Sequence, residues 1–338
     1  MSPEDFDPTV TALLAAVQVT PAEVAGCAPM TGGTYNSLLR LVLRDGRRWV
    51  VKQPPAAGSG SALRYEHDLL RGETEFYRAV RNVSGVPVPQ LVHVEAGGSP
   101  PVVSGIVMTE CPGVAWSEVD TSLAAGERTT LRQELGRVVA RLHSLTGPEY
   151  GYPARPFGPP AADWRSAFTA MTGAVLDDAE HHGVELPRPT ARVRELLAEA
   201  GEVLTDVTRP ALVHFDLWQG NLLLDGDPGA RTLAGVIDAE RMFWGDPVAE
   251  FVSLALFDDI ERDDAFLTGY AEAGGEVAFT DAMRLRLDLY RCYLYLIMLV
   301  EAVPRRYAPE QLGWTRRTVG KHLSASLDAV ASALAGQP

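Results

Sequence analysis

Lysine, asparagine and cysteine are scarce in this chain of 338 residues, which contains two Lys, three Asn and three Cys. The cysteines, Cys27, Cys111 and Cys292, are odd in number and far apart, which argues against a disulfide framework and a zinc site. Reduced thiols are typical of the cytoplasm, where we expect the protein to act. The acidic N-terminus also lacks the basic residues that begin a secretory signal peptide.

Long apolar runs are missing as well. The stretch from Leu287 to Val303 is interrupted by Asp288, Arg291 and Glu301, so it is too short and too charged to cross a bilayer. Positive charge is in deficit, since 30 Lys and Arg stand against 44 Asp and Glu and give a net charge of −14. That balance disfavours nucleic acids and anionic membranes as partners.

The composition that remains is that of a globular protein, with 46% apolar and 22% charged residues. The length suits two domains better than one compact core. Alternating apolar residues predict strands and a hairpin early in the chain, and amphipathic stripes predict helices over most of the remainder. We therefore expect an α+β protein with a β-rich first part and a larger helical second part.

One segment combines several polar residues that belong together chemically. An apolar run ends in His214 and leads to Asp216 and then Asn221, and a second apolar run ends in Asp238. Phosphoryl transfer needs one carboxylate to orient a hydroxyl, and an amide oxygen with a second carboxylate to hold a cation. The cation ligands are hard oxygens, which suits Mg²⁺.

Lys52 is the second informative position, because Arg fills nearly every other basic position of the chain. It ends a strand-like stretch, and a compact ammonium suits nucleotide phosphates better than a forked guanidinium. One strand earlier, the pair Gly32-Gly33 would let backbone N–H groups approach phosphates. The alternatives are an exposed lysine at a strand edge and an ordinary turn.

In this order the motifs resemble those of the aminoglycoside phosphotransferase family, the antibiotic-kinase branch of the protein-kinase-like fold. The resemblance runs from about residue 28 to 300. It implies a bilobal fold, with a small β-rich N-lobe at residues 1–112 and a larger, mainly helical C-lobe at residues 113–338. Asp238 is followed by Ala239-Glu240 rather than Phe-Gly, which argues against protein substrates.

The resemblance also implies roles for single residues. Asp216 would orient the acceptor hydroxyl as the catalytic base, while Asn221 and Asp238 would hold Mg²⁺. Glu73 fits the family's helix-C glutamate, which steadies Lys52, better than Glu66 or Glu75. The residues expected to bind the nucleotide, ATP or GTP, are Gly32, Gly33, Thr34, Asn36, Lys52, Glu73, Met108, Thr109 and Cys111.

Two positions depart from the family pattern. Phe215 stands where Gly is usual, and its bulk would reshape the loop or line the acceptor pocket. Glu250 stands where Asp is common after Gly245-Asp246-Pro247, and we expect it to keep an anchoring role. We expect His214 to brace the loop rather than to carry a proton. The residues expected near the acceptor are Phe215, Trp218, Glu240, Trp244, Asp258 and Asp259, although core packing explains the tryptophans equally well.

The acceptor is expected to be a small molecule with a free hydroxyl, bound by a monomer or homodimer. An antibiotic is the first expectation, either aminoglycoside-like or a nucleoside such as the capuramycin type, so that phosphorylation gives resistance. Acidic residues crowd positions 250–281 and would attract a cation, unless they are only a solvated face. The alternatives are a metabolite kinase of the same fold, for choline, homoserine, methylthioribose or fructosamine, and a non-catalytic pseudokinase.

Overall fold

The computed structural model describes residues 6–30, 36–55, 63–97 and 102–336, and its two compact units are interleaved along the chain. The first unit comprises Met1–Ser59, Asp68–Ala124 and Gln219–Glu240. The second comprises Gly60–His67, Ala125–Trp218 and Arg241–Pro338. A single boundary between residues 112 and 113, as expected from the sequence, does not match this division, because residues 219–240 pair with strands of the first unit.

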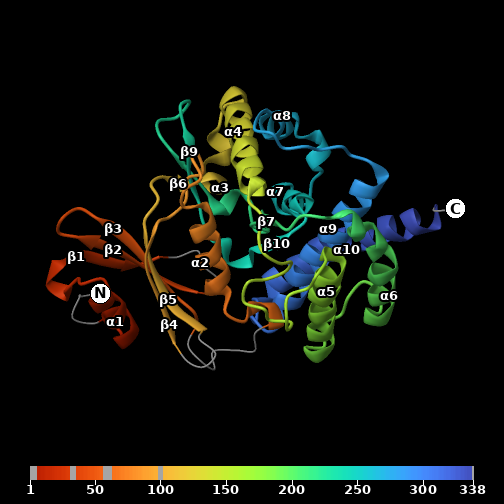
Figure 1. Ribbon diagram of the computed structural model, residues 1–338, viewed down its shortest axis with the longest axis horizontal. Coiled ribbons are helices and arrows are strands. Elements are labelled where there is room, and N and C mark those ends of the chain that lie inside the picture. The colour runs from red at the N-terminus through yellow and green to blue at the C-terminus, as the bar shows by residue number, and fades with distance from the viewer. Residues whose placement is uncertain (1–5, 31–35, 56–62, 98–101, 337–338) are drawn as a thin grey trace. The chain divides into compact units, whose positions relative to one another are not determined.

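The first unit is built on a five-stranded antiparallel sheet with the strand order β1-β2-β3-β5-β4 (Figure 1). The predicted hairpin is present, since Asp45 and Gly46 lie in the turn between β2 and β3. Apolar residues alternate along β2, and their burial alternates with them. The strands of this sheet are β1 (Val24–Pro29), β2 (Ser37–Leu43), β3 (Arg48–Gln53), β4 (Leu91–Gly97) and β5 (Val102–Thr109).

Two helices cover opposite faces of this sheet. Successive side chains of a strand point to opposite faces. On β3, Trp49 and Val51 pack with α1 (Pro8–Ala16) in one core cluster, whereas Lys52 faces α2 (Leu69–Val80). Asp7 caps α1 by accepting the N–H groups of its first turn. The sheet thus carries an apolar core on one face and brings a cation to the helix on the other.

A smaller three-stranded sheet completes the first unit. It has the order β6-β8-β9 and consists of β6 (Val114–Ala115), β8 (Leu222–Asp225) and β9 (Thr232–Val236). The short helix α3 (Trp116–Val119) follows β6. Gly113 precedes β6 with a φ of +97°, and a Cβ there would overlap the Leu224 carbonyl, so only glycine fits this approach.

The second unit is mainly helical, and its centre is the long helix α9, which is buried along most of its length (Figure 1). A two-stranded antiparallel sheet of β7 (Ala211–Val213) and β10 (Phe243–Gly245) supports the loop that follows β7. The helices are α4 (Ala125–Ser144), α5 (Trp164–His181), α6 (Thr190–Ala200), α7 (Phe251–Leu254), α8 (Asp264–Glu272), α9 (Asp281–Glu301) and α10 (Pro309–Ala335).

The β-rich N-terminal part and the helical C-terminal part confirm the α+β fold class expected from the sequence. Within the described residues, no helix combines the length and the apolar character needed to span a membrane.

Helices α4 and α8 pack backbone against backbone through two glycines. A Cβ on Gly136 would overlap the Phe266 carbonyl oxygen, and a Cβ on Gly269 would overlap the Gln133 carbonyl oxygen. Backbone atoms cannot move aside as the end of a flexible side chain can. The close approach therefore depends on both residues lacking a side chain.

Gly269→Ala is expected to lower the free energy of unfolding by about 1–3 kcal/mol, the usual cost of overpacking a dense interior. Gly126→Ala on the same helix pair is the control, because a Cβ at Gly126 meets nothing within 4 Å. That substitution should stabilise by roughly 0.5–1 kcal/mol through helix propensity. Urea unfolding of both variants measures the contrast, and equal midpoints would contradict the packing argument.

Candidate active site

Lys52 is a buried cation that lies among three carboxylates in the first unit. Its Nζ is 2.7 Å from Glu73 and 3.0 Å from Glu240, and it also bonds Asp238. Only 3% of the lysine side chain is exposed. Burial acts to lower the pKa of Lys52, but the charges of Asp238, Glu240 and Glu73 outweigh it and hold that pKa well above its ordinary value. The lysine is therefore a fixed, permanent cation.

Two polar side chains surround this cluster and fix its carboxylates. Tyr77, on the same face of α2 as Glu73, donates its hydroxyl to Glu73 at 3.0 Å and accepts the Asp238 N–H at 3.2 Å. Asn36, at the entrance to β2, donates its amide to Glu240 Oε2 at 2.6 Å. The Asn36–Glu240 bond joins positions 204 residues apart. The helix, the first sheet and the segment after β9 thus meet at one lysine.

Asn221 and Asp238 lie at adjoining ends of the β8–β9 pair. Asn221 ends a short 3-10 helix just before β8, and its carbonyl accepts the Ile237 N–H at 3.0 Å. Asp238 follows with a φ of +62°, which is uncommon for a residue other than glycine. Such strain is kept where the surroundings impose it, often at functional sites. This turn carries the Asp238 carboxylate to Lys52.

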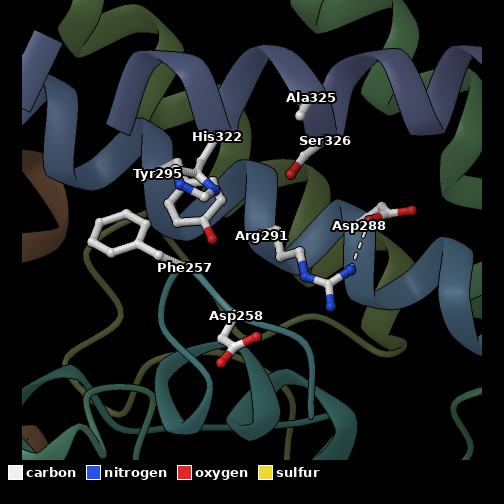
Figure 2. Close-up of a pocket in the computed structure, with 8 residues that line it drawn as sticks. All are labelled: Phe257, Asp258, Asp288, Arg291, Tyr295, His322, Ala325 and Ser326. Carbon is white, nitrogen blue, oxygen red and sulfur yellow. Dashed lines mark hydrogen bonds and ion pairs between the residues drawn. The ribbon is translucent and has the colours of Figure 1, made fainter. Parts of the chain in front are cut away.

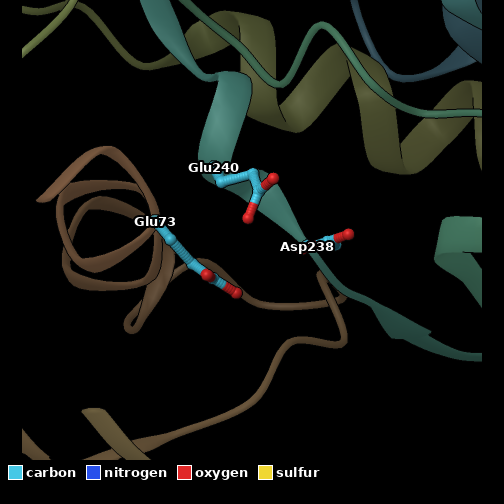
Figure 3. Close-up of side chains that lie close together, drawn as sticks. All are labelled: Glu73, Asp238 and Glu240. Carbon is cyan, nitrogen blue, oxygen red and sulfur yellow. The ribbon is translucent and has the colours of Figure 1, made fainter. Parts of the chain in front are cut away.

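The three carboxylates lie close enough together to share a cation, and in this structure that cation is the Lys52 ammonium. Glu73, Asp238 and Glu240 each present an oxygen, and these oxygens lie within 4.8 Å of one another (Figure 3). The Asp238 side chain is 36% exposed and so remains accessible. Carboxylate oxygens suit Mg²⁺, and Asp238 is the one of these three carboxylates that we expect to hold it. Glu240, which we expected near the acceptor, lies in this cluster instead, because its partners are Lys52 and Asn36.

The expected hinge residues lie at the end of β5 in the first unit. Met108 is buried between Val50 of β3 and Leu91 of β4. The Thr109 N–H donates to Gln90, and within the described residues the Cys111 N–H has no partner. Burial raises the pKa of the Cys111 thiol to about 11, so the thiol stays protonated. Gly32, Gly33 and Thr34 lie outside the described residues.

In the second unit, the loop around Asp216 is anchored by Glu250. This carboxylate accepts the His214 N–H at 2.6 Å and the Phe215 N–H at 3.0 Å. Ser253 accepts the Leu217 N–H at 3.1 Å. The His214 ring nitrogen Nδ1 accepts the Asp216 N–H at 3.3 Å, which is a bracing contact of the kind expected for this histidine. The loop is therefore held by its own backbone N–H groups, and the Asp216 carboxylate is left partly exposed.

Arg241 is a neighbour of Asp216 that no sequence motif indicated. Its guanidinium lies 3.8 Å from the Asp216 carboxylate and 2.9 Å from that of Glu301 on α9. Arg305 also contacts Glu301, at 3.3 Å, and Tyr65 donates its hydroxyl to it at 3.2 Å. The network fixes a cation beside the candidate catalytic carboxylate.

Two of the residues expected near the acceptor are buried in the core of the second unit, which corrects that expectation. Phe215 has a φ of +63° and no exposed surface, and its ring packs on Phe243 and Tyr293. Trp244 is 6% exposed and belongs to β10. Phe215 adopts the left-handed backbone that the family's glycine would favour, so its side chain turns into the core.

The other expected acceptor residues keep accessible surface. Trp218 is 43% exposed. Asp258 is exposed, and within the described residues no basic side chain pairs with it, whereas Asp259 lies 3.6 Å from Arg291. Several acids of positions 250–281 are ion-paired, through Arg132–Asp263, Arg137–Glu272 and Arg284–Glu261. The count of acids in this region therefore overstates its free negative charge.

Burial raises the pKa of Glu250 to about 7, although its bonds to His214, Phe215 and Ser253 act in the opposite direction. The folded state therefore binds a proton more tightly than the unfolded state, whose carboxyl has an ordinary pKa. The protonated Glu250 side chain therefore stabilises the folded state. This contribution is fully present below about pH 4.5 and is lost as the pH rises through about 7.

Glu250→Gln is expected to remove this share of the pH dependence. Relative to the variant, the wild-type protein should lose about 1–3 kcal/mol of unfolding free energy between pH 5 and pH 8. Urea unfolding at both pH values measures it, with Glu276→Gln as an exposed control that should change nothing. If the free energy of unfolding changed equally with pH in Glu250→Gln and in the wild type, Glu250 would titrate in its ordinary range.

The model of the phosphotransferase enzyme family, APH, matches residues 26–290. The chain belongs to this family. The match includes Lys52, Glu73, Asp216, Asn221 and Asp238, so the residues chosen from the sequence fall inside the family's own span. The protein is accordingly a small-molecule phosphotransferase of the family, and its expected membership and enzymatic nature are confirmed.

Several known proteins are similar to this chain at low sequence identity. A probable ketoamine kinase of Lactiplantibacillus plantarum is 22% identical over 302 residues, which cover 86% of this chain and 94% of that protein. A crystal structure of a candidate fructosamine-3-kinase from Thermobifida fusca has a TM-score of 0.66 at 21% identity, covering 94% of this chain and 99% of that one. A thermostable mutant of the aminoglycoside phosphotransferase APH(4)-Ia, solved with ADP and hygromycin B, has a TM-score of 0.61 at 17% identity, covering 94% of this chain and 97% of that one.

Proposed function

We propose that this phosphotransferase moves the γ-phosphate of ATP to a hydroxyl of an amine-bearing small molecule. The observation that carries the proposal is the buried Lys52, paired with Glu73 and held beside Asp238. A kinase needs this lysine fixed by a helix glutamate and placed close to the metal-binding aspartate. A pseudokinase would be expected to lack one of these groups, and the chain keeps all of them.

Each residue has a part in the proposed reaction. Lys52 binds the α- and β-phosphates, and Asn221 and Asp238 hold Mg²⁺, which offsets the negative charge of the phosphates when bound. Asp216 accepts a hydrogen bond from the acceptor hydroxyl and aims its oxygen at the γ-phosphorus. Met108, Thr109 and Cys111 bind the base of the nucleotide. The Cys111 N–H, which has no partner among the described residues, supports this assignment.

The acceptor class follows from the relatives and from the charge of the chain. Aminoglycosides and ketoamines are both sugars that carry amines, and a net charge of −14 favours a cationic acceptor. We propose an aminoglycoside-like antibiotic as the first candidate, in which case phosphorylation would confer resistance. A ketoamine is the second, favoured by the ketoamine kinase and fructosamine-3-kinase relatives.

A screen with both nucleotides tests the proposal. The protein would be incubated with Mg²⁺ and ATP or GTP, together with aminoglycosides, a ketoamine and a capuramycin-type nucleoside, and the products analysed by mass spectrometry. We expect one acceptor class to gain a single phosphate with ATP, and Asp216→Asn to slow this gain strongly. A protein that binds Mg-ATP but phosphorylates no hydroxyl compound in such panels would overturn the proposal.

A further inference from the structure

A cavity of about 190 Å³ lies in the second unit between α9, α10 and the segment that follows α7 (Figure 2). One water molecule occupies about 30 Å³ of liquid, so this space exceeds that of a single bridging water. Among the residues of α9 that line the cavity, Tyr295 lies nearest to Glu301 in sequence. It precedes Glu301 by six residues, which is an axial rise of about 9 Å. The cavity is therefore set apart along α9 from the network around Asp216.

One wall of the cavity is aromatic. The rings of Phe257 and Tyr295 are stacked, with centroids 5.7 Å apart and an interplanar angle of 11°. His322 of α10 adds a third ring, 4.9 Å from that of Phe257. Phe257 has a φ of +64°, which is rare for a bulky residue, so the backbone holds its ring in an unusual direction. An aromatic wall of this kind attracts organic cations through its π electrons.

The charged residues of the cavity leave an excess of negative charge. Arg291 is the guanidinium in the lining, and its charge is offset by Asp288 at 2.9 Å and Asp259 at 3.6 Å. Asp258 lies on the opposite side of Arg291 from α10 and has no cationic partner in the part of the chain that the structure describes (Figure 2). A cation entering the cavity would therefore meet an uncompensated carboxylate.

The hydroxyl of Ser326 lines the same space. Ser326 of α10 is 6% exposed, and its oxygen is directed toward the cavity in Figure 2. A hydroxyl that faces a cavity can donate to or accept from a ligand or a water molecule that enters it.

We propose that this cavity is a binding site for a small organic ammonium ion, held by the aromatic wall and Asp258 and within reach of the Ser326 hydroxyl. The site goes beyond the proposed phosphoryl transfer, because none of its residues belongs to the Lys52 cluster or the Asp216 loop. The ammonium group has two possible sources, a distal amine of the acceptor or a separate amine that acts as an effector.

Binding of tetramethylammonium to the full-length protein tests the site, measured by isothermal titration calorimetry without nucleotide. This probe has no hydroxyl and cannot be phosphorylated. We expect saturable binding, and at least about tenfold weaker binding of tert-butanol, a neutral molecule of similar size. Asp258→Asn should weaken tetramethylammonium about tenfold, and Tyr295→Leu should weaken it as well.

Glu276→Gln is the matched control, since it removes one exposed carboxylate outside the cavity and should leave the affinity unchanged. Equal binding of the charged and neutral probes, no saturable binding, or equal effects of Asp258→Asn and Glu276→Gln would each overturn the proposal. Circular dichroism and urea unfolding establish that every variant is folded.

Kinase assays then separate the two sources of the ammonium group. If tetramethylammonium raises the KM of the acceptor in the wild type but not in Asp258→Asn, the cavity receives an amine of the acceptor. If it leaves that KM unchanged while binding persists, the ligand is a separate amine. Because the calorimetric test needs no turnover, the site can be established or rejected whatever the outcome for the phosphoryl transfer.

Discussion

Replacement of Asp216 by Asn is expected to lower kcat by about 10²- to 10⁴-fold, the usual contribution of a positioned base. The amide keeps the shape of the side chain, but it lacks the negative charge of the carboxylate and cannot accept the proton of the acceptor hydroxyl. The backbone bonds that hold the loop come from Glu250, Ser253 and His214, so the variant should fold normally. Steady-state turnover with the acceptor identified by the screen measures the loss.

The control for this prediction is nucleotide affinity, which should be unchanged because Asp216 is not part of the Lys52 cluster. Fluorescent-nucleotide displacement measures it. Turnover of Asp216→Asn within a few-fold of the wild type would remove Asp216 from the chemistry. The proton would then have to pass to another group.

Lys52→Met is expected to produce a double defect. Loss of the ammonium removes the contact to the phosphates and should reduce kcat/KM for ATP by about 10²-fold or more, the scale seen when a transition-state charge partner is deleted. It also leaves three carboxylates without their shared cation, which should lower the free energy of unfolding by roughly 3–5 kcal/mol. Kinetics and urea unfolding, each without and with Mg²⁺, measure the two effects.

Lys321→Met is the matched control, because Lys321 is the other lysine of the chain and is exposed on α10. Lys321→Met should change neither kcat/KM for ATP nor the free energy of unfolding. In the double variant Lys52→Met/Glu73→Gln, stability should recover in part while activity stays low, since one buried charge is removed but the phosphate contact is still missing. Normal stability of Lys52→Met alone would mean that the carboxylates are already protonated in the folded protein.

The residues that could be predicted from the sequence are those whose role follows from their immediate neighbours in the sequence. Lys52 ends an apolar strand, and Asp238 ends another, so each could be placed before any contact was known. Glu73 was chosen over Glu66 and Glu75 by family pattern, and in the structure Glu73 forms an ion pair with Lys52. Glu66 belongs to a different ion pair, with Arg305.

The residues that could not be predicted depend on partners far along the chain. Arg241 follows Glu240 directly, but its partner Glu301 is 60 residues away. Phe215 and Trp244 carry side chains that suit a ligand site and a core equally well, and only tertiary packing decides between them. The pairing of several acids with arginines of α4 and α9 was hidden for the same reason.

The interleaving of the two units has a consequence for how the chain matures on the ribosome. The first unit is interrupted after Ala124 and resumes at Gln219, so β8, β9 and Asp238 arrive only after the intervening part has been made. At a synthesis rate of about 5–20 residues per second, the delay lasts several seconds or longer. During that time Lys52 lacks two of its three acidic neighbours, and the nascent N-terminal region is exposed to chaperones and proteases in an unfinished form.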